Sequence, residues 1–319
     1  MSQAAASPLV VALVGPTGCG KSECALALVE RLQPKLRLEI VSVDSAQVYR
    51  GMDIGTAKPD GAARARVPHH LIDICDPAQN FSAGDFVREA HAAIAAIRQR
   101  GALPLLVGGT MLYLRALRHG LADMPPADAR VRAEIDALAA GAGWSAVHAE
   151  LARVDPVAAA RIAPQDAQRL QRALEVYRIT DSPISHWHAR ARAPRPAHRW
   201  LTYAFWPPSR EQLRQRLQAR FDAMLRAGFV DEVRTLFERG DLTPQHASMR
   251  AVGYRQLWHY CAGEAMLADA ATQAVTATAQ LAKRQMTWLR REREMHAVND
   301  VSVGALEVLA EAISATACA

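Results

Sequence analysis

The sequence predicts an α/β fold: a parallel sheet of the P-loop NTPase-like class with an inserted all-helical domain. Val10–Val14 is an apolar run typical of a buried strand, and Gly15–Ser22 (GPTGCGKS) fits the pattern G-x-x-x-x-G-K-[ST] at every fixed position. Glu23–Leu32 then has the periodicity of an amphipathic helix. Further apolar strands flank a long stretch without strand-like runs, which indicates a sheet interrupted by a helical insertion.

The segment after the first strand predicts a phosphate-binding loop. Its glycines let the backbone curl so that successive N–H groups point toward an anion. The following helix directs its positive end at the same place. Lys21 is expected to reach the phosphates, and Ser22 can ligate Mg²⁺. We therefore expect a phosphorylated ligand to be held by Gly15, Pro16, Thr17, Gly18, Cys19, Gly20, Lys21 and Ser22.

The next strands are expected to end near this loop. Leu38–Val43 predicts a second strand that runs into Asp44, and Leu103–Val107 predicts a third that ends in a Gly-Gly-Thr turn at 108–110. In a parallel sheet, ligands gather at the carboxyl ends of the strands. Residues 46–59 between them are polar and punctuated by glycine, which is typical of a functional loop. Ser82–Arg100 predicts an amphipathic helix capped by its serine.

The second half of the chain is mostly helical in pattern. Residues 121–198 show helices separated by proline and glycine, and we expect them to form a helical insertion within a core of 1–120 and 199–319. Arg199–Trp206 predicts a strand that returns to the sheet. Ser209 then starts a helix with Gln212 three residues on, as in a capping box. The remainder to Ala319 is expected to be helical.

Composition limits the classes of protein. The 319 residues are 50% hydrophobic and 22% charged, and no apolar run approaches the ~20 residues of a membrane helix. The stretch before the loop lacks a basic n-region, so we expect no signal peptide. The five cysteines are scattered without a C-x-x-C pair, which argues against a disulfide framework or zinc site and favours a cytoplasmic protein. The net charge of +6 by itself favours a nucleic-acid partner only slightly.

Asp44 is the acid that the pattern directs at the site. It could coordinate magnesium, act as a general base, or cap the next turn. No other apolar strand ends in an acid, because the third strand runs into Gly-Gly-Thr where an ATPase would often carry its Walker-B aspartate. That weakens ATP hydrolysis as the reaction and leaves the three roles of Asp44 open.

Basic residues indicate anionic partners. Arg220 lies at the margin of the apolar stripe of the helix Ser209–Arg226, where it faces the protein body and could bind a diphosphate or pair with a carboxylate. Arg-rich faces occur in Gln165–Arg178, at 250–255 and in Gln280–Arg290. A single face of this kind is more often an ordinary solvent-exposed surface. Several of them together favour the phosphate backbone of a nucleic acid as the partner. His69, His70, His186 and His188 are interpreted as structural, since no carboxylate or cysteine completes a metal set.

Eight segments, spread over nearly the whole chain, carry a family resemblance. They are GPTGCGKS (15–22), DSAQVYRGMDIGTAKP (44–59), PHHLID (68–73), LLVGGTMLY (105–113), DPVAAARI (155–162), QRLQRALEVYR (168–178), AVGYRQLW (251–258) and QLAKRQMTWLR (280–290). By these segments the chain resembles the bacterial tRNA dimethylallyltransferases, the tRNA isopentenyltransferase family. The segment 44–59 is close to diagnostic, while the phosphate loop is shared by many enzyme types. The departures are Cys75, where relatives often carry a basic residue, and Cys19 in the loop.

The resemblance implies a function and roles for residues. Such enzymes bind the diphosphate of dimethylallyl diphosphate in the phosphate loop and transfer the prenyl group to the exocyclic amine of an adenosine beside the anticodon of tRNA. Lys21 and Arg220 would neutralise the leaving group, Ser22 would help hold Mg²⁺, and Asp44 would accept the amine proton, with Thr17 beside them as a catalytic residue. The tRNA-contacting residues would be Asp44, Ser45, Ala46, Gln47, Thr110, Arg132, Gln168, Arg169, Leu170, Gln171, Arg172, Arg250, Ala251, Val252, Gly253, Tyr254, Arg255, Lys283, Arg284, Gln285, Met286, Thr287, Trp288, Leu289 and Arg290.

Three other functions stay open. A small-molecule kinase or ATPase is disfavoured by the absent second acid. A prenyltransferase acting on free adenine nucleotides would share the diphosphate half, but would not need the basic helical insertion. A non-catalytic RNA-binding protein does not account for the phosphate loop and Asp44. The expected partners are thus the anticodon stem-loop of tRNA and dimethylallyl diphosphate, with no membrane, and a monomer is expected.

Overall fold

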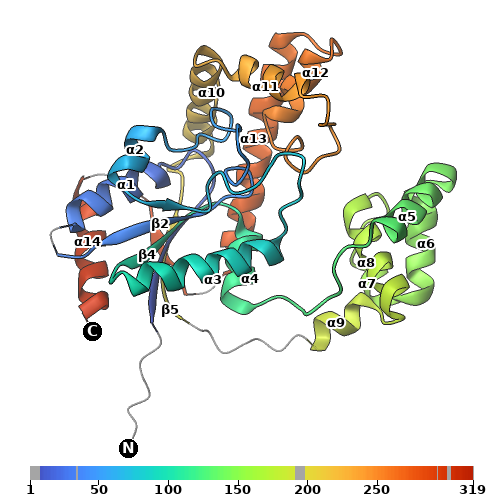
Figure 1. Cartoon of the computed structure of the whole chain (residues 1–319), viewed down its shortest axis with the longest axis horizontal. Helices are drawn as coiled ribbons and strands as arrows, with labels where there is room; N and C mark the ends of the chain where they lie inside the picture. The colour runs from blue at the N-terminus through green and yellow to red at the C-terminus, as the bar shows by residue number, and fades with distance from the viewer. Residues whose placement is uncertain (1–7, 34, 191–197, 293, 300–302, 319) are drawn as a thin grey trace, which may run out of the picture. The chain divides into compact units, whose positions relative to one another are not determined.

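The computed structural model describes residues 8–33, 35–190, 198–292, 294–299 and 303–318 (Figure 1). The chain divides into two compact units. We call Met1–Arg118 with Pro196–Ala319 the core unit and His119–Arg195 the helical unit. The insertion expected from the sequence spans 121–198, of which 191–197 lie outside the described residues.

The core unit is built on a parallel sheet of six strands in the order β3-β2-β4-β1-β5-β6. This confirms the predicted fold class. In register, Val14 stands opposite both Gly108 and Ala204, and Val43 stands opposite Gly108, so the strands end together at one edge. The strands are β1 (Leu9–Val14), β2 (Leu38–Val43), β3 (His69–His70), β4 (Leu103–Gly108), β5 (Arg199–Phe205) and β6 (His296–Val298).

One expectation for the C-terminal part was wrong. The remainder of the chain was expected to be helical to its end, but His296–Val298 forms β6 and pairs with β5 through Tyr203 and His296. Three residues are too few to show a strand periodicity, so only the neighbouring strand makes this segment extended. The two-residue β3 has the same origin, because it exists through its pairing with Ile40 and Val41 of β2.

Helices cover both faces of the sheet, as Figure 1 shows. Every residue of β1 is buried, because alternate side chains enter different cores. Val11 and Leu13 pack with residues of α1 (Lys21–Leu32) and α14 (Val303–Cys318). Val10 and Ala12 pack with residues of α3 (Ala83–Gln99) and α4 (Met111–His119). Helix α3 begins with a capping box between Ser82 and Asp85.

A third core lies between loop 44–59 and a group of helices. Val48, Tyr49 and Met52 of the loop are buried with Phe229 and Tyr254, whose rings meet edge to face at 4.9 Å. This packing fixes the loop beside the carboxyl edge of the sheet. The helices are α10 (Arg210–Arg226), α11 (Phe229–Glu238), α12 (Tyr254–Cys261) and α13 (Leu267–Leu289). The short helix α2 (Gly61–Arg66) follows the loop and is not part of this core.

The helical unit has its own core. Ile135, Val147, Leu151, Leu170 and Leu174 are fully buried together. These side chains recur at helical spacing, which explains how short helices separated by proline and glycine form a compact body. The helices are α5 (Ala129–Ala142), α6 (Trp144–Val154), α7 (Pro156–Ala159), α8 (Ala167–Thr180) and α9 (Ile184–Arg190).

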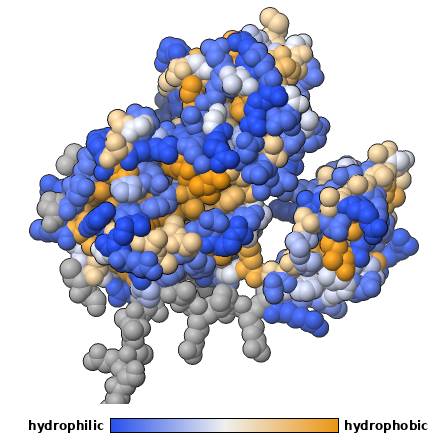
Figure 2. All heavy atoms as spheres, in the orientation of Figure 1, coloured by the Kyte–Doolittle hydropathy of each residue, from blue (hydrophilic) through white to orange (hydrophobic). Residues whose placement is uncertain are grey.

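The surface is mainly polar. Figure 2 shows hydrophilic residues over most of the visible surface of each unit, and apolar residues gathered in a recessed area on the core unit. Among the described residues, no helix is long and apolar enough to cross a membrane.

Candidate functional site

The phosphate loop joins β1 to α1 in a backbone path that glycine permits. Gly18 and Gly20 have φ of 82° and 77°, in the left-handed region that other residues rarely adopt. Gly20 is also the N-cap of α1, so the N–H groups of the first turn face the loop. A Cβ on Gly18 would lie 2.9 Å from Cδ2 of Leu217, and one on Gly15 would lie 2.8 Å from the carbonyl oxygen of Phe205. The backbone contact requires glycine at position 15, whereas at position 18 the positive φ is the stronger reason, because the leucine side chain can move.

Lys21 is held within this loop. Its Nζ donates a hydrogen bond to the carbonyl oxygen of Pro16 at 2.7 Å. Burial lowers the pKa of Lys21 to about 8, the charge of Asp44 opposes that shift, and the charge of Arg220 adds to it. The ammonium therefore lacks a full counter-charge inside the protein, and an anion at the loop would supply it.

Asp44 lies directly after β2, and one of its carboxylate oxygens accepts hydrogen bonds from the backbone of the following turn. Its Oδ1 accepts hydrogen bonds from the backbone N–H groups of Ala46 at 2.8 Å and Gln47 at 3.3 Å. Within the described chain, no hydrogen bond engages its Oδ2. The carboxylate thus caps the turn, as one of the three roles requires, while its second oxygen stays available. Beside it, Thr110 Oγ1 accepts from the N–H of Ser45 at 3.0 Å.

Two cavities meet at this carboxylate. The first, which we call the loop cavity, has a volume of about 910 Å³ and is lined by Gly18, Lys21 and Ser22. The second, the helix cavity, has a volume of about 530 Å³ and is lined by Thr110, Tyr254 and other residues of the helical layer. Both are lined by Thr17, Asp44, Thr56, Gly109, Arg220, Met224 and Gln285. A ligand in the loop cavity can therefore meet a ligand in the helix cavity beside Asp44.

Cations surround the loop cavity. Arg220 forms no hydrogen bond or ion pair with any described residue, and burial lowers its pKa, opposed by the charges of Asp44 and Glu23. Arg216, one turn earlier on α10, also lines the loop cavity. The apolar stripe of α10 packs inward through Leu213 and Leu217, which brings these arginines to the cavity wall. The arrangement favours an anion with more than one negative charge.

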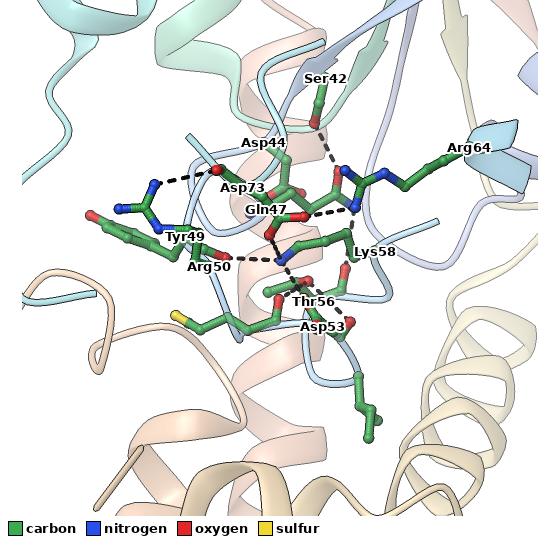
Figure 3. Close-up of polar contacts among 12 residues, drawn as sticks. Ser42, Asp44, Gln47, Tyr49, Arg50, Asp53, Thr56, Lys58, Arg64 and Asp73 are labelled. Atoms are coloured by element: carbon green, nitrogen blue, oxygen red, sulfur yellow. Dashed lines mark hydrogen bonds and ion pairs between the residues drawn. The ribbon is translucent and has the colours of Figure 1, made fainter. Parts of the chain in front are cut away.

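Loop 44–59 is fixed by a buried lysine, as Figure 3 shows. The side chain of Lys58 is 2% exposed, and its Nζ donates to the carbonyl oxygen of Tyr49 at 2.9 Å, to Asp73 Oδ1 at 2.6 Å and to Asp53. Burial alone would raise the pKa of Asp73, but hydrogen bonds from Lys58 and Arg64 hold it below its usual value. Lys58 therefore shapes the loop and does not reach either cavity.

Gln285 joins three parts of the site. From α13 its Oε1 accepts from the backbone N–H of Thr17 at 2.9 Å, and its Nε2 donates to the carbonyl oxygen of Gly109 at 2.8 Å. A Cβ on Gly109 would lie 2.5 Å from this Nε2, so the turn and the amide fit closely. The family resemblance predicts a tRNA contact for Gln285, whereas in the structure its side chain holds the phosphate loop against the turn at Gly109.

The other expected contacts of the core unit divide by burial. On α13, Met286 and Leu289 are buried in the core, so their side chains do not face solvent. In the segment 250–255, Gly253 and Tyr254 are buried. Ala46, Ala251, Val252 and Trp288 are partly buried and line the helix cavity. The exposed members are Ser45, Arg250, Arg255, Lys283, Arg284, Thr287 and Arg290.

In the helical unit a buried acid organises two of the expected arginines. Glu175 is fully buried and accepts from Arg132 Nε at 2.7 Å and from Arg172 Nη1 at 2.6 Å. Burial would raise the pKa of Glu175, but these hydrogen bonds hold it below its usual value. Leu170 is part of the core, whereas Gln168 and Arg169 are exposed and Gln171 is partly buried. Sequence periodicity separates these faces but does not reveal the acid beneath them.

The described residues contain no group of three or more His, Cys, Asp or Glu side chains that could hold a metal. Mg²⁺ is usually held by one or two protein oxygens together with substrate phosphates and water. Ser22, whose side chain lines the loop cavity at the start of α1, suits that arrangement. His69 and His70 are engaged otherwise, with the carbonyl oxygen of Val67 and with Glu39.

The parallel sheet, the phosphate loop and the paired cavities define a phosphate-loop α/β protein. A family model described as IPP transferase matches residues 47–292. The chain belongs to this family. It is 53% identical over 308 residues to a tRNA dimethylallyltransferase of Acidovorax sp. (strain JS42), which covers 96% of this chain and 95% of that protein. It is 55% identical over 305 residues to the enzyme of the same name from Paracidovorax citrulli, over 92% of this chain and 87% of that protein.

Solved structures agree with this membership. The crystal structure of the full-length tRNA isopentenylpyrophosphate transferase from Bacillus halodurans matches with a TM-score of 0.70 and 36% identity, over 98% of this chain and 97% of that one. A eukaryotic dimethylallyltransferase, captured in crystallographic snapshots of its action on tRNA, matches with a TM-score of 0.78 and 26% identity. That match covers 96% of this chain and 78% of that one.

Proposed function

We propose that this protein is a tRNA dimethylallyltransferase. It transfers a dimethylallyl group from dimethylallyl diphosphate to the exocyclic N6 amine of the adenosine that is 3′-adjacent to the anticodon, and it releases diphosphate. One observation carries the proposal: a cationic cavity at the phosphate loop meets a second cavity at Asp44 and Arg220. This arrangement suits a donor and an acceptor that enter from different sides, as group transfer requires.

The loop cavity takes the donor's diphosphate. N–H groups of the loop 15–22 and the start of α1 surround the anion. Lys21 and Arg220 neutralise the charge that grows on the diphosphate as the allylic C–O bond breaks. Burial partly desolvates both cations in the free protein, which strengthens their attraction for an anion. Ser22 would hold Mg²⁺ with the diphosphate oxygens, and the metal would supply further neutralisation of the leaving group.

Asp44 acts on the acceptor. The adenine N6 attacks the allylic carbon, a C–N bond forms, and Asp44 takes the proton that the amine loses. Two backbone N–H groups hold its Oδ1, and Asp44 lines both cavities, which supports a role for the free Oδ2 as the proton acceptor. Thr17 and Thr110 line that space, Thr17 in both cavities and Thr110 in the helix cavity.

The acceptor approaches through the helix cavity. A base must leave its stack to enter such a site. Trp288, which is partly buried, supplies aromatic surface in the lining. Exposed cations on α13 and at 250–255 would bind the phosphate backbone. We extend the proposal to the helical unit, where Arg132, Arg169 and Arg172 would contact the tRNA. We further propose that the enzyme acts as a monomer in the cytoplasm.

The experiment that tests the proposal is transfer of a radiolabelled prenyl group from dimethylallyl diphosphate. Purified protein is offered unmodified tRNA, free AMP, or no acceptor, with Mg²⁺ present. The expected result is label on tRNA only, at the adenosine beside the anticodon. Label on AMP and not on tRNA would replace the proposal with a nucleotide prenyltransferase, and label on neither would reject prenyl transfer.

A further inference from the structure

Glu232 of α11 collects four hydrogen bonds at the edge of the site. Its Oε2 accepts from the backbone N–H groups of Asp53 at 2.9 Å and Ile54 at 2.7 Å. Its Oε1 accepts from the N–H of Gly55 at 3.2 Å and from the Tyr254 hydroxyl at 2.5 Å. Three successive backbone donors that converge on one carboxylate form a charge-assisted anchor, since each bond is strengthened by the ionised acceptor.

Three of the four partners of Glu232 line one or the other cavity, and Asp53 lines neither. Ile54 lines the loop cavity, and Gly55 and Tyr254 line the helix cavity. Thr56, the next residue along the turn, lines both. Glu232 itself lines neither cavity, so it acts on the site through its partners.

The packing around the turn leaves it little freedom while the anchor is intact. A Cβ on Gly55 would lie 2.1 Å from Cε2 of Phe229 and 2.6 Å from Cε2 of Tyr254. Burial first, and then the charge of Glu232, raise the pKa of Tyr254. The phenol therefore remains protonated and donates to the carboxylate throughout the working pH range. Removing the carboxylate would free three backbone donors and the phenol at once.

We propose that Glu232 is a positioning residue of the transfer reaction. Its carboxylate holds the turn 53–56 against Tyr254 and so sets the shape of the acceptor side where the two cavities meet. The inference rests on the proposed function for the identity of the acceptor. The diphosphate side depends instead on the phosphate loop, Lys21 and Arg220, none of which touches Glu232. Loss of Glu232 should therefore impair use of the acceptor and spare binding of the donor.

The test separates the two substrates. Glu232→Ala is assayed at saturating donor with varied tRNA, while binding of dimethylallyl diphosphate without tRNA is measured by calorimetry. We expect kcat/KM for tRNA to fall at least tenfold and donor affinity to stay within twofold. Glu232→Gln, which keeps one acceptor oxygen, should recover part of the loss. Glu238→Gln, on the same helix but outside both cavities, is the matched control and should match the wild type.

A double-mutant cycle with Tyr254→Phe shows whether Glu232 acts through the phenol. If it does, the double variant loses less than the product of the two single losses. Thermal unfolding of each variant identifies a general loss of structure. The proposal is overturned if Glu232→Ala uses tRNA as well as the wild type does, or if donor affinity falls in parallel with acceptor use. A wild type that transfers no prenyl group would reject the proposed function instead, which keeps the two failures distinct.

Discussion

The state of Lys21 makes donor binding depend on pH. In the free protein its pKa is about 8, lowered chiefly by burial. A bound diphosphate stabilises the ammonium and raises that pKa, so binding takes up a proton wherever Lys21 is neutral beforehand. Donor affinity is therefore highest well below pH 8 and falls as the pH rises through 8. About nine-tenths of the molecules carry the charge at pH 7 and about one-tenth at pH 9, which predicts a loss of about tenfold, or ~1.4 kcal/mol.

Calorimetry with dimethylallyl diphosphate, without tRNA so that no transfer occurs, measures this loss between pH 7 and 9. The control is Lys21→Arg, whose guanidinium stays charged over the whole range. The pH dependence of its donor affinity reports the ionisation of the ligand and of all other groups. The wild type should lose about tenfold more affinity than this variant across the interval. Parallel slopes for the two proteins would refute the assignment of the titration to Lys21.

Three single substitutions test the roles proposed for Asp44, Arg169 and Lys21. Asp44→Asn keeps an oxygen that can accept hydrogen bonds from the N–H groups of Ala46 and Gln47, but the amide cannot take a proton. We therefore expect kcat to fall ~10²–10⁴-fold while the thermal unfolding temperature changes little. Near-normal turnover would mean that Asp44 only caps the turn. Arg169→Ala removes an exposed charge and should reduce the salt slope of tRNA binding by about 1 without altering donor affinity; an unchanged slope contradicts that contact. Lys21→Met removes a charge that burial disfavours, so the free energy of unfolding of the ligand-free protein should rise by about 1–3 kcal/mol. Urea denaturation at pH 7 measures this change. A lower urea midpoint for the variant than for the wild type would contradict the lowered pKa of Lys21.

Much of the fold can be predicted from local sequence, because the longer buried strands show a recognisable apolar pattern. Each of β1 and β2 is six residues long and wholly buried. β1 is a continuous apolar run that ends at Gly15, and β2 is apolar apart from Glu39 and Ser42. Helix α3 carries its own start signal in the capping box at Ser82. The strands β3 and β6 have no such signal. Their two and three residues are extended because a neighbouring strand offers hydrogen bonds.

The same limit applies to the site. Gly15–Ser22 is contiguous, so its chemistry can be predicted from spacing, and Arg220 could be directed inward from the stripe of one helix. Glu232 could not be found in this way, because its partners lie about 180 residues earlier in the chain. Gln285 likewise braces Thr17 from 268 residues away. Contacts of that separation depend on the folded arrangement, and a helix periodicity gives only the face on which such a residue lies.

Two of the three roles predicted for Asp44, the turn cap and the proposed general base, are compatible in the structure. A turn cap and a general base are alternatives only if each role needs the whole carboxylate. In the structure Oδ1 alone accepts from Ala46 and Gln47, while Oδ2 makes no hydrogen bond within the described chain. The cap then assists the base, because two N–H groups fix the orientation of the carboxylate before the acceptor arrives. A group that is already held in place loses little conformational entropy when the reaction begins, and this favours a catalytic acid or base that doubles as the cap of its own loop.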